Sequence, residues 1–532
     1  MFVSLRLRGM STGWKVHTRS TTGSPSNPRP FEEIPGPKSL ALIGTLYRYL
    51  PLIGDYSFKK LHKTGAKKLA EYGPLVREEI VPGVYLVLVF KPDDIAEVFK
   101  SEMGKYPERR SHLALMKYRS DRKDLYNSGG LLPTNGEQWW KLRKEFQKDL
   151  SKPQNIVNYI EEIDKVMRKF ISVCGPGFHR DLMTLLSRLY LERKYNFHQS
   201  YYNQDPTRIP VILIQKKLTV ILVTCLVVFD EPLDVFSEAQ MTSDSTSSKL
   251  IKAAFDANDL ILTLDHSRLW KYFETPKYRK FRGNLETMQK VAIDMVTRKA
   301  NRMKESGGNE KPSILENYLS NKNVDLKDVV GVACDMLLAG IDTTAYSSAY
   351  ALYHVSRNDK VQEKLREEVR KLLPEADSPI TSATLRDAVY VKAVIKETFR
   401  LNPISIGVGR ILLSDIVLSG YRVPKGTNVV TQNQVACRLP EYFPDPDSFK
   451  PERWLRDNPD SKNVHPYLLL PFGHGPRACI ARRLAEQNLQ MFLLRMCRAY
   501  SFKWRGGVLD CVSVPLNTPD GPITIELTPV DD

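Results

Sequence analysis

Residues 471–483 read Pro471-Phe472-Gly473-His474-Gly475-Pro476-Arg477-Ala478-Cys479-Ile480-Ala481-Arg482-Arg483. Two glycines one residue apart allow backbone angles that other residues avoid, so the chain can turn sharply before Cys479. The apolar spacing then becomes helical, with one face formed by Ala481, Leu484, Ala485, Asn488, Leu489, Phe492 and Leu493. We therefore predict that Cys479 lies in a tight loop at the start of a helix, where free backbone N–H groups and the helix dipole favour its thiolate form.

A thiolate that a rigid turn holds next to Arg477 suits a soft metal ion or a haem iron. The alternative is a buried structural cysteine, which is the commoner role of a lone cysteine. The complete loop, with its paired glycines, proline and arginine, favours the ligand.

The length and composition indicate one large domain. The chain has 532 residues, of which 42% are hydrophobic, and no Gly/Ser-rich linker divides it after about residue 35. We predict a domain over residues 32–532 that is mainly α with a small β portion. The seven cysteines lack pair spacing, which favours a reducing compartment over a disulfide framework; they are Cys174, Cys225, Cys334, Cys437, Cys479, Cys497 and Cys511.

The formal net charge of +17 raises the question of nucleic-acid binding. No nucleic-acid-binding module is visible, and the basic residues are spread along the chain. The sequence therefore predicts no nucleic-acid partner, and an acidic protein partner explains the charge as well.

The first 31 residues predict an organellar transit peptide, because they hold basic residues, nine serines and threonines, and no acidic residue. The basic residues are Arg6, Arg8, Lys15, Arg19 and Arg29. No apolar run reaches about 18 residues, so no membrane-spanning anchor is indicated. The alternative is a disordered basic tail.

Periodicity and turn residues predict a strand at 84–90 and helices at 93–100, from residue 137 onward, at 329–353 and at 391–400. Residues 512–527 suggest a terminal hairpin with Asn517 and Thr518 at its turn, near the substrate pocket.

The helical pattern breaks between Glu192 and Thr224. The intervening segment, residues 193–223, contains Pro206 and Pro210, which interrupt a helix. It is far longer than ordinary loops, so we interpret it as an insertion, either a retained intron or another gene-model error. A partner-binding loop is the alternative.

A polar stretch, Ala339-Gly340-Ile341-Asp342-Thr343-Thr344, interrupts the long apolar helix. Glycine, aspartate and threonine are poor choices in mid-helix by propensity. The threonine hydroxyl can bond back to a carbonyl and open a groove that admits a small ligand. The alternative is a buried threonine bonded only to its own helix.

Three helical pairs also suggest function. Trp139 and Arg143 are four residues apart and share a face, so both can donate hydrogen bonds to a carboxylate. Glu397 and Arg400 are three apart and can form an ion pair. Lys392 and Lys396 share a face and are expected to be exposed, as most lysine pairs are.

Taken in order, these motifs resemble the cytochrome P450 superfamily, whose haem-ligand loop reads Phe-Gly-x-Gly-x-Arg-x-Cys. The resemblance spans about residues 32–532 apart from the insertion, and departs from the pattern at Ala481, where the family usually has glycine. It implies a cytochrome P450 fold and an iron protoporphyrin IX cofactor. In this resemblance Cys479 is the iron ligand and Phe472 belongs to its loop. The haem propionates are bound by Trp139, Arg143, Arg410 and Arg477.

The resemblance also assigns roles elsewhere. Thr343 orients water and protons during oxygen activation, and Asp342 relays protons. Glu397, Arg400 and the arginine of Phe449-Lys450-Pro451-Glu452-Arg453-Trp454 form a structural trio, and this arginine is Arg453. The lysines before Glu397 are similar to those of the mitochondrial class, where they bind an acidic two-iron ferredoxin supplied by an NADPH-dependent reductase.

These similarities imply a monooxygenase that uses O2 to hydroxylate a C–H bond, peripherally bound to the matrix side of the mitochondrial inner membrane. Residues 109–115, 129–136 and 402–410 resemble the insect ecdysteroid 22-hydroxylases of the family, which implies a steroid substrate, the ketotriol precursor of 2-deoxyecdysone. Alternatives are another steroid or a xenobiotic as substrate, a haem-thiolate isomerase or lyase, and an inactive haem-binding protein if the insertion is genuine.

Overall fold

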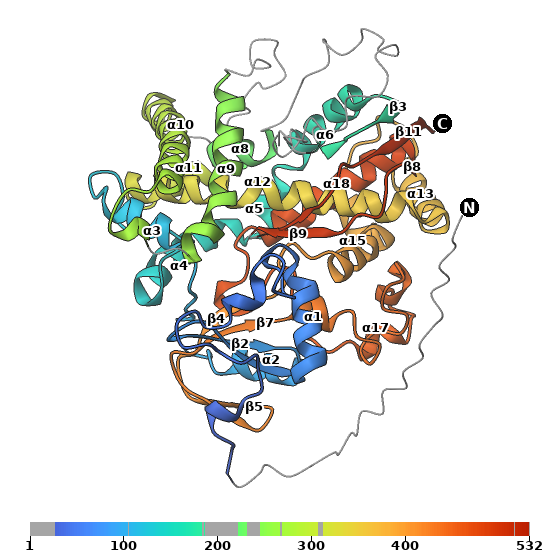
Figure 1. Ribbon diagram of the computed structural model, residues 1–532. Helices are drawn as coiled ribbons and strands as arrows, with labels where there is room; N and C mark the ends of the chain where they lie inside the picture. Colours follow the sequence, from blue (N-terminus) through green and yellow to red (C-terminus); the bar gives the residue numbers. More distant parts are fainter. Residues whose placement is uncertain are drawn as a thin grey trace, which may run out of the picture.

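A long apolar helix, α12 (Leu326–Ser356), runs through the middle of the helical body (Figure 1). Its side chains are buried on almost every side, including Leu337, Ala349 and Tyr350 at 0% exposure. Within the described residues it is the one helix long and apolar enough to cross a membrane, and 82% of its most apolar window is buried inside the protein. A helix that is apolar all round forms the core of a large helical fold.

The computed structural model describes residues 27–104, 106–183, 186, 222–230, 245–266, 269–306, 312–514 and 516–530. Its other helices are α1 (Leu61–Tyr72), α2 (Pro92–Lys100), α3 (Leu113–Ser120), α4 (Gly136–Leu150), α5 (Pro153–Val157), α6 (Ile160–Cys174), α8 (Leu222–Phe229), α9 (Thr246–His266), α10 (Pro276–Ser306), α11 (Ile314–Leu319), α13 (Asp359–Leu372), α14 (Ser382–Asp387), α15 (Val389–Leu401), α16 (Asn433–Ala436), α17 (Asp460–Asn463) and α18 (Arg482–Ala499). Its strands are β1 (Leu75–Val81), β2 (Val84–Val89), β3 (Gly177–His179), β4 (Gly409–Ile411), β5 (Ile416–Leu418), β6 (Tyr421–Val423), β7 (Asn428–Thr431), β8 (Tyr500–Trp504), β9 (Cys511–Val514), β10 (Leu516–Pro519) and β11 (Ile525–Pro529).

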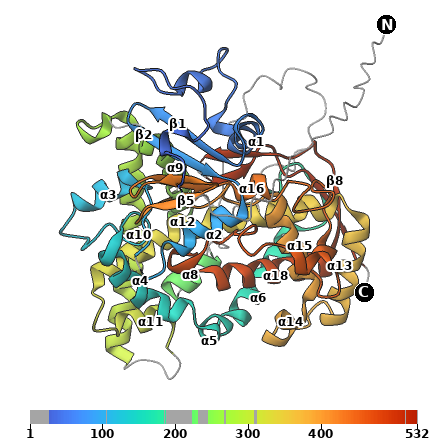
Figure 2. The same cartoon turned by 90° about the horizontal axis from the view of Figure 1, so that it is seen from below.

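A four-stranded sheet in the order β1-β2-β7-β4 forms the smaller part of the molecule, beside the helical body (Figures 1 and 2). β2 pairs with β7 in parallel, from Leu86 opposite Asn428 to Val89 opposite Thr431. β4 then pairs antiparallel to β7 and places Arg410 opposite Val429. The sheet therefore joins the N-terminal quarter of the chain to the segment that carries Arg410.

The main elements expected from the sequence are confirmed. The predicted strand at 84–90 is β2, and the helices expected at 93–100, 329–353 and 391–400 are α2, α12 and α15. The helix expected after Asn135-Gly136 is α4. The expectation of a mainly α fold with a small β portion is also confirmed.

The predicted terminal hairpin is wrong in its position. β9 and β10 form a short hairpin in which Val514 faces Leu516, so Asn517 and Thr518 lie in a strand and not at the turn. β11 pairs with β3 and β8 in a different sheet. The sequence Pro519-Asp520-Gly521-Pro522 explains the break, because proline lacks the N–H donor that a strand ladder needs.

The folded part of the chain already includes Arg29. Its N–H donates to the carbonyl oxygen of Gly420 at 2.9 Å, and its guanidinium lies 3.7 Å above the Tyr421 ring. Of the predicted transit peptide, residues 1–31, residues 1–26 lie outside the described part of the chain and residues 27–31 lie within it. The predicted insertion, residues 193–223, also lies outside the described part except for its last two residues, which open α8.

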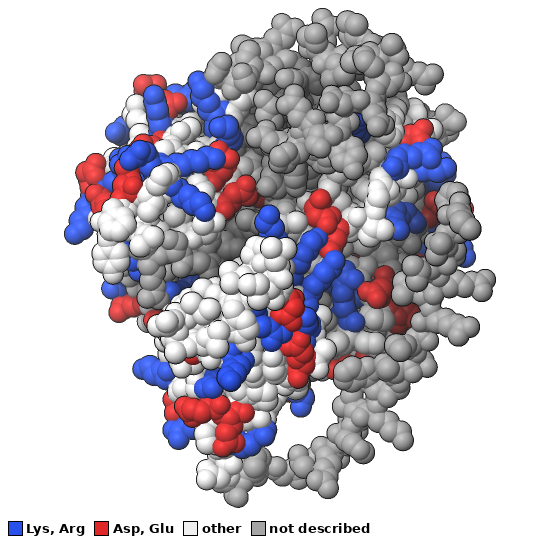
Figure 3. All heavy atoms as spheres, in the orientation of Figure 1, with Lys and Arg blue, Asp and Glu red and all other residues white. Residues whose placement is uncertain are grey.

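Charged side chains of both signs are interspersed over the face shown in Figure 3. Lysines and arginines alternate there with aspartates and glutamates. Among the described residues of this face, the positive charges are mixed with negative ones and form no single basic stripe.

Candidate active site

The Cys479 loop is closed by its own backbone. Gly473 and Gly475 take positive φ angles of 73° and 68°, which glycine adopts without steric cost. The N–H of Cys479 then donates to the carbonyl oxygen of Phe472 at 2.8 Å. α18 begins three residues after the cysteine. The loop is therefore a fixed turn at a helix start, as the sequence predicts.

Cys479 is accessible to solvent although protein atoms surround it on all sides. Burial raises the pKa of the Cys479 thiol, and this outweighs the opposite effects of the Ala481 N–H and Arg143. The backbone N–H and the nearby arginine therefore favour the thiolate as expected, but desolvation is the larger effect on the uncoordinated thiol, and a coordinated metal ion would reverse the balance.

Four buried or half-buried arginines come together beside this loop: Arg109, Arg143, Arg410 and Arg477. Arg477 donates from Nε to the carbonyl oxygen of Pro107 at 2.9 Å and from Nη2 to Asn135 Oδ1 at 2.7 Å. Its guanidinium lies 4.1 Å above the Trp139 ring. Arg143 donates from Nη2 to the carbonyl oxygen of Ala478 at 2.8 Å. The helix that carries Trp139 and Arg143 is thereby connected to the cysteine loop.

The charge of this cluster is not balanced by the described part of the chain. Burial and the repulsion of Arg109 and Arg410 lower the pKa of Arg477 to about 8. Burial likewise lowers the pKa of Arg109 and of Arg143 to about 10. Arg477 Nη1 and Arg109 Nε are buried without hydrogen-bond partners. A dianionic group such as the two propionates of haem fits this cluster, because it would supply both the missing acceptors and the missing charge.

Arg410 is the one member of the cluster with an ion-pair partner among the described residues. Its Nε lies 2.6 Å from Oε1 of Glu102, and both side chains are buried. Its Nη2 also donates to the carbonyl oxygen of His474 in the cysteine loop at 3.1 Å. Sequence reasoning missed Glu102, because nothing in its local pattern marks it as buried.

The polar stretch of α12 is accessible along one side. Ala339 is exposed and Gly340 and Thr343 are half-buried, although most of their neighbours are buried. Thr343 Oγ1 donates to the carbonyl oxygen of Ala339 at 3.1 Å. The threonine hydroxyl thus bonds to a carbonyl oxygen of its own helix, as expected from the sequence, on the side of the helix that is partly exposed.

Asp342 points to another helix. It is 2% exposed, and its Oδ2 accepts a hydrogen bond from Asn258 Nδ2 of α9 at 2.9 Å. Asn258 also donates to the carbonyl oxygen of Leu338 at 2.7 Å. The adjacent residues Asp342 and Thr343 thus lie in different surroundings, one buried against α9 and the other partly exposed. The sequence alone did not indicate the contact with Asn258.

The structure brings Glu397, Arg400 and Arg453 into contact. Arg400 donates from Nε and Nη2 to the two carboxylate oxygens of Glu397, both at 2.9 Å, and both residues are fully buried. Arg453 Nε lies 3.4 Å from Glu397 Oε1. Arg400 also donates to the carbonyl oxygens of Cys437, Pro446 and Ser448. The trio joins α15 to the segment before the cysteine loop.

The two lysines of α15 differ in exposure. Lys396 is exposed, and its ammonium lies 5.9 Å from the Trp454 ring centroid. Lys392 is half-buried, and its ammonium donates to the carbonyl oxygen of Arg386 at 2.7 Å. The expectation that both lysines are exposed therefore holds for Lys396 alone.

A second cysteine has neighbours of metal-ligand type. Cys511 Sγ lies 3.4 Å from His62 Nδ1, and Asp510 Oδ1 lies 3.0 Å from His62 Nε2. One ion cannot use both ring nitrogens of one histidine, and Lys60 and Lys63 already pair with Asp510. This cluster is a hydrogen-bonded link between α1 and β9 and does not suit an iron ligand.

The sequence comparisons agree with this geometry. The family model described as Cytochrome P450 matches residues 34–182 and 215–518. Cytochrome P450 302a1, mitochondrial, from Drosophila melanogaster is 43% identical over 94% of this chain and 95% of its own length. Probable cytochrome P450 301a1, mitochondrial, from the same organism is 29% identical over 97% and 90%. Cytochrome P450 CYP12A2 from Musca domestica is 29% identical over 84% and 82%.

Proposed function

Because this chain belongs to the cytochrome P450 family, and is therefore a haem-dependent monooxygenase, we propose that Cys479 binds the haem iron and that the substrate is an ecdysteroid precursor hydroxylated at carbon 22. The observation that carries the site assignment is the arginine cluster beside the accessible Cys479, which lies in a closed loop. Bound haem supplies the activation of O2 and the transfer of one oxygen atom.

The protein holds and orients this group. Cys479 supplies the iron ligand from a loop that its own backbone and Arg143 keep in place. Arg143, Arg410 and Arg477 supply donors for the propionates, and Trp139 forms the flat surface on which Arg477 stacks. Because these guanidinium groups are already held in place, their side chains need little rearrangement when the anionic propionates bind.

In this proposal, residues of α12 deliver protons to the reaction. The Thr343 hydroxyl donates a hydrogen bond to the carbonyl oxygen of Ala339 and lies on the accessible side of the helix. Asp342 is buried, and its carboxylate accepts a hydrogen bond from Asn258 of α9. We assign Thr343 the final delivery of protons and Asp342 the relay behind it.

Three segments support the steroid assignment, because they resemble the ecdysteroid 22-hydroxylases, and two of them are joined to each other by hydrogen bonds. The N–H of Arg109 donates to Asn135 Oδ1 at 3.1 Å, and Asn135 Nδ2 donates to the Arg109 carbonyl oxygen at 2.9 Å. The N–H of Asn517 in the terminal hairpin donates to the carbonyl oxygen of Ile404 at 2.8 Å. The segments 109–115 and 129–136 are thus joined to each other, and 402–410 to β10.

The test of the substrate is turnover of the purified holoenzyme with ferredoxin, its reductase and NADPH. Incubation with the ketotriol should give one product hydroxylated at carbon 22, identified by mass spectrometry and nuclear magnetic resonance. Cholesterol and a hydrophobic xenobiotic serve as competing substrates. Hydroxylation of either competitor at a higher kcat/KM than the ketotriol would reject the assignment.

The redox partner in this proposal is a two-iron ferredoxin reduced by an NADPH-dependent reductase, in the mitochondrion. The first support is that two relatives are named mitochondrial. The second is the exposed cation Lys396 on α15, which belongs to the helix packed against α18 behind the cysteine loop. An acidic partner at this face would approach the haem from the side of its thiolate ligand.

Peripheral attachment to the matrix side of the inner membrane is the third part of the proposal. Two turns near the N-terminus expose large apolar side chains: Leu42 at 91%, Leu52 at 106% and Ile53 at 77%. Leu52 also has a positive φ of 73°, which a leucine rarely adopts. Side chains held out of the fold in this way are typical of a surface that contacts lipid or another protein.

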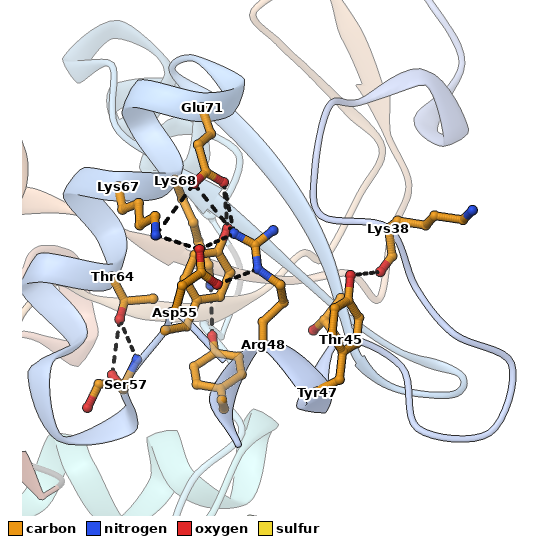
Figure 4. Close-up of polar contacts among 12 residues, drawn as sticks. Lys38, Thr45, Tyr47, Arg48, Asp55, Ser57, Thr64, Lys67, Lys68 and Glu71 are labelled. Atoms are coloured by element: carbon orange, nitrogen blue, oxygen red, sulfur yellow. Dashed lines mark hydrogen bonds and ion pairs between the residues drawn. The ribbon is translucent and has the colours of Figure 1, made fainter. Parts of the chain in front are cut away.

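The turn that carries Leu52 is rigid. Arg48 binds both carboxylate oxygens of Asp55, at 2.6 and 2.7 Å, and Glu71 of α1 at 3.2 Å, as Figure 4 shows. The N–H of Gly54 donates to the carbonyl oxygen of Leu50 at 2.8 Å. The exposed leucine and isoleucine are therefore presented by a braced turn, and Lys67 adds a cation to the same network (Figure 4).

We retain the interpretation of residues 193–223 as an insertion that the enzyme does not need, and of residues 1–31 as a transit peptide. Support for the first comes from the family match, which stops at residue 182 and resumes at residue 215. Deleting 193–223 should raise the yield of haem-loaded protein, and transcripts should mostly lack the segment. A deletion that loses haem or activity would show that the segment belongs to the enzyme.

A further inference from the structure

Glu102 holds one end of the arginine cluster. It follows α2 directly, and its N–H donates to the carbonyl oxygen of Phe99 at 3.2 Å. Its carboxylate lies 2.6 Å from Arg410 Nε, while the Phe99 ring lies 5.2 Å from the centre of the same guanidinium. A single short segment therefore clamps Arg410 by charge and by an aromatic surface.

The clamp leaves Arg410 with donors to spare. Nε faces Glu102, one Nη1 hydrogen is used by the carbonyl oxygen of Gly409 at 2.9 Å, and one Nη2 hydrogen by that of His474 at 3.1 Å. A guanidinium has five N–H groups, so two remain. Glu102 thus fixes the orientation of Arg410 without occupying all of its donors.

The carboxylate is also the one negative charge in ion-pair contact with the four arginines within the described residues. Burial raises the pKa of the Glu102 carboxyl, whereas Arg410 and Arg477 act in the opposite direction and favour its charged form. The cluster carries four positive charges, and two propionates and Glu102 together supply three negative ones. Neutralising Glu102 would leave the surroundings of the haem more positive.

We propose that Glu102 is a positioning residue that orients Arg410 toward a haem propionate, and that its negative charge lowers the reduction potential of the ferric–ferrous couple. Reduction adds an electron to the haem, and a nearby negative charge opposes that step. The desolvated surroundings strengthen this effect, because water screens the charge little. The inference rests on the proposed haem site, which the experiment tests separately.

The experiment compares four purified holoenzymes: wild type, Glu102→Gln, Glu102→Asp and Glu145→Gln. Glu145 is the matched control because it is also a buried carboxylate, at 5% exposure, paired with a lysine, Lys148, at 2.7 Å. It lies on α4 but contacts Lys148 and Asn321 and none of the four arginines. Each protein is studied by spectroelectrochemistry, by its reduced carbon-monoxide spectrum and by resonance Raman of the propionate bending modes.

Glu102→Gln should raise the reduction potential and shift a propionate bending mode, whereas Glu102→Asp and Glu145→Gln should stay near wild type in potential. A haem-loaded Glu102→Gln protein with wild-type potential overturns the proposal. If Glu102→Gln does not fold, Glu102→Asp decides through the propionate bending mode, because its shorter side chain withdraws from the 2.6 Å contact with Arg410. A shifted mode supports the positioning role, and an unshifted mode rejects it. Absence of the carbon-monoxide band from wild type would instead reject the haem site.

Discussion

Arg143 donates from Nη2 to the carbonyl oxygen of Ala478 at 2.8 Å, although 335 residues separate the two. Ala478 immediately precedes Cys479, so the helix that carries Trp139 also determines where the cysteine loop lies. The same guanidinium donates from Nε to Gln147 Oε1 at 2.7 Å, which fixes its direction. The Cys479 loop and the arginine that we propose as a propionate donor therefore form one connected unit.

Replacing Cys479 with serine should abolish the reduced carbon-monoxide band that characterises the family. A serine hydroxyl does not supply the thiolate that gives the band, while the loop closure through Phe472 uses only backbone atoms and should survive. The carbon-monoxide difference spectrum measures the band, and circular dichroism checks the fold. Retention of the band in a folded C479S protein would contradict the ligand assignment.

Cys511→Ser is the matched cysteine control, since Cys511 is buried but lies in the His62 link. This variant should keep the band at full intensity. Loss of the band in C511S and not in C479S would reverse the assignment of the two cysteines.

Replacing Thr343 with alanine should uncouple NADPH consumption from product. The hydroxyl that faces the open side of α12 is lost, and proton delivery slows by about tenfold or more. Haem content should not change, and the peroxide released per NADPH should rise. Thr344→Ala is the control, because Thr344 is buried and donates to the carbonyl oxygen of Gly340 at 3.3 Å. Equal coupling in T343A and wild type would make Thr343 a packing residue.

Reversing the charge of Lys396 should weaken ferredoxin binding by about five- to tenfold, as expected for an exposed ion pair. Lys392→Glu should weaken binding less through lost contact, since its ammonium is turned to the carbonyl oxygen of Arg386. Surface plasmon resonance over a range of salt concentrations measures both effects, and wild-type binding should fall as salt rises. Binding that does not depend on salt would point to another docking face.

Replacing Leu52 with aspartate should reduce binding to liposomes of inner-membrane composition by about tenfold or more, because burying one leucine in lipid contributes roughly 1.5–3 kcal/mol. Leu52 is fully exposed, so the stability of the fold should not fall. Val389→Asp is the control, since Val389 is also an exposed apolar residue, at 54% exposure, but begins α15. Equal sedimentation of L52D and wild type with liposomes would exclude this turn from the contact.

The sequence predicted what periodicity and turn chemistry determine locally. Strand β2 and helices α2, α4, α12 and α15 each follow from a continuous apolar pattern with clear punctuation. The closed Cys479 loop follows from two glycines and a proline. The Glu397, Arg400 and Arg453 trio could be expected because the resemblance pairs motifs that are distant in the sequence.

The remaining contacts depend on distances that no local pattern contains. Glu102 is a polar residue in an ordinary sequence context, and only the folding of the chain brings it to 2.6 Å from Arg410. Asn258 meets Asp342 in the same way, across two helices. The burial of Lys392 follows from the preceding turn at Arg386, which the helical pattern of α15 does not include.

The parallel pairing of β2 with β7 has a consequence for the order in which the protein acquires its structure. Residues 86–89 of β2 can pair with β7 only after residues 428–431 have been made. The hydrogen bond from Arg477 to the carbonyl oxygen of Pro107 likewise joins residues that are 370 positions apart. Contacts this distant in sequence form late and slowly, since a long loop must close first. During import or synthesis, β2 therefore stays an open edge until most of the chain has emerged, and the cofactor cannot be captured before then.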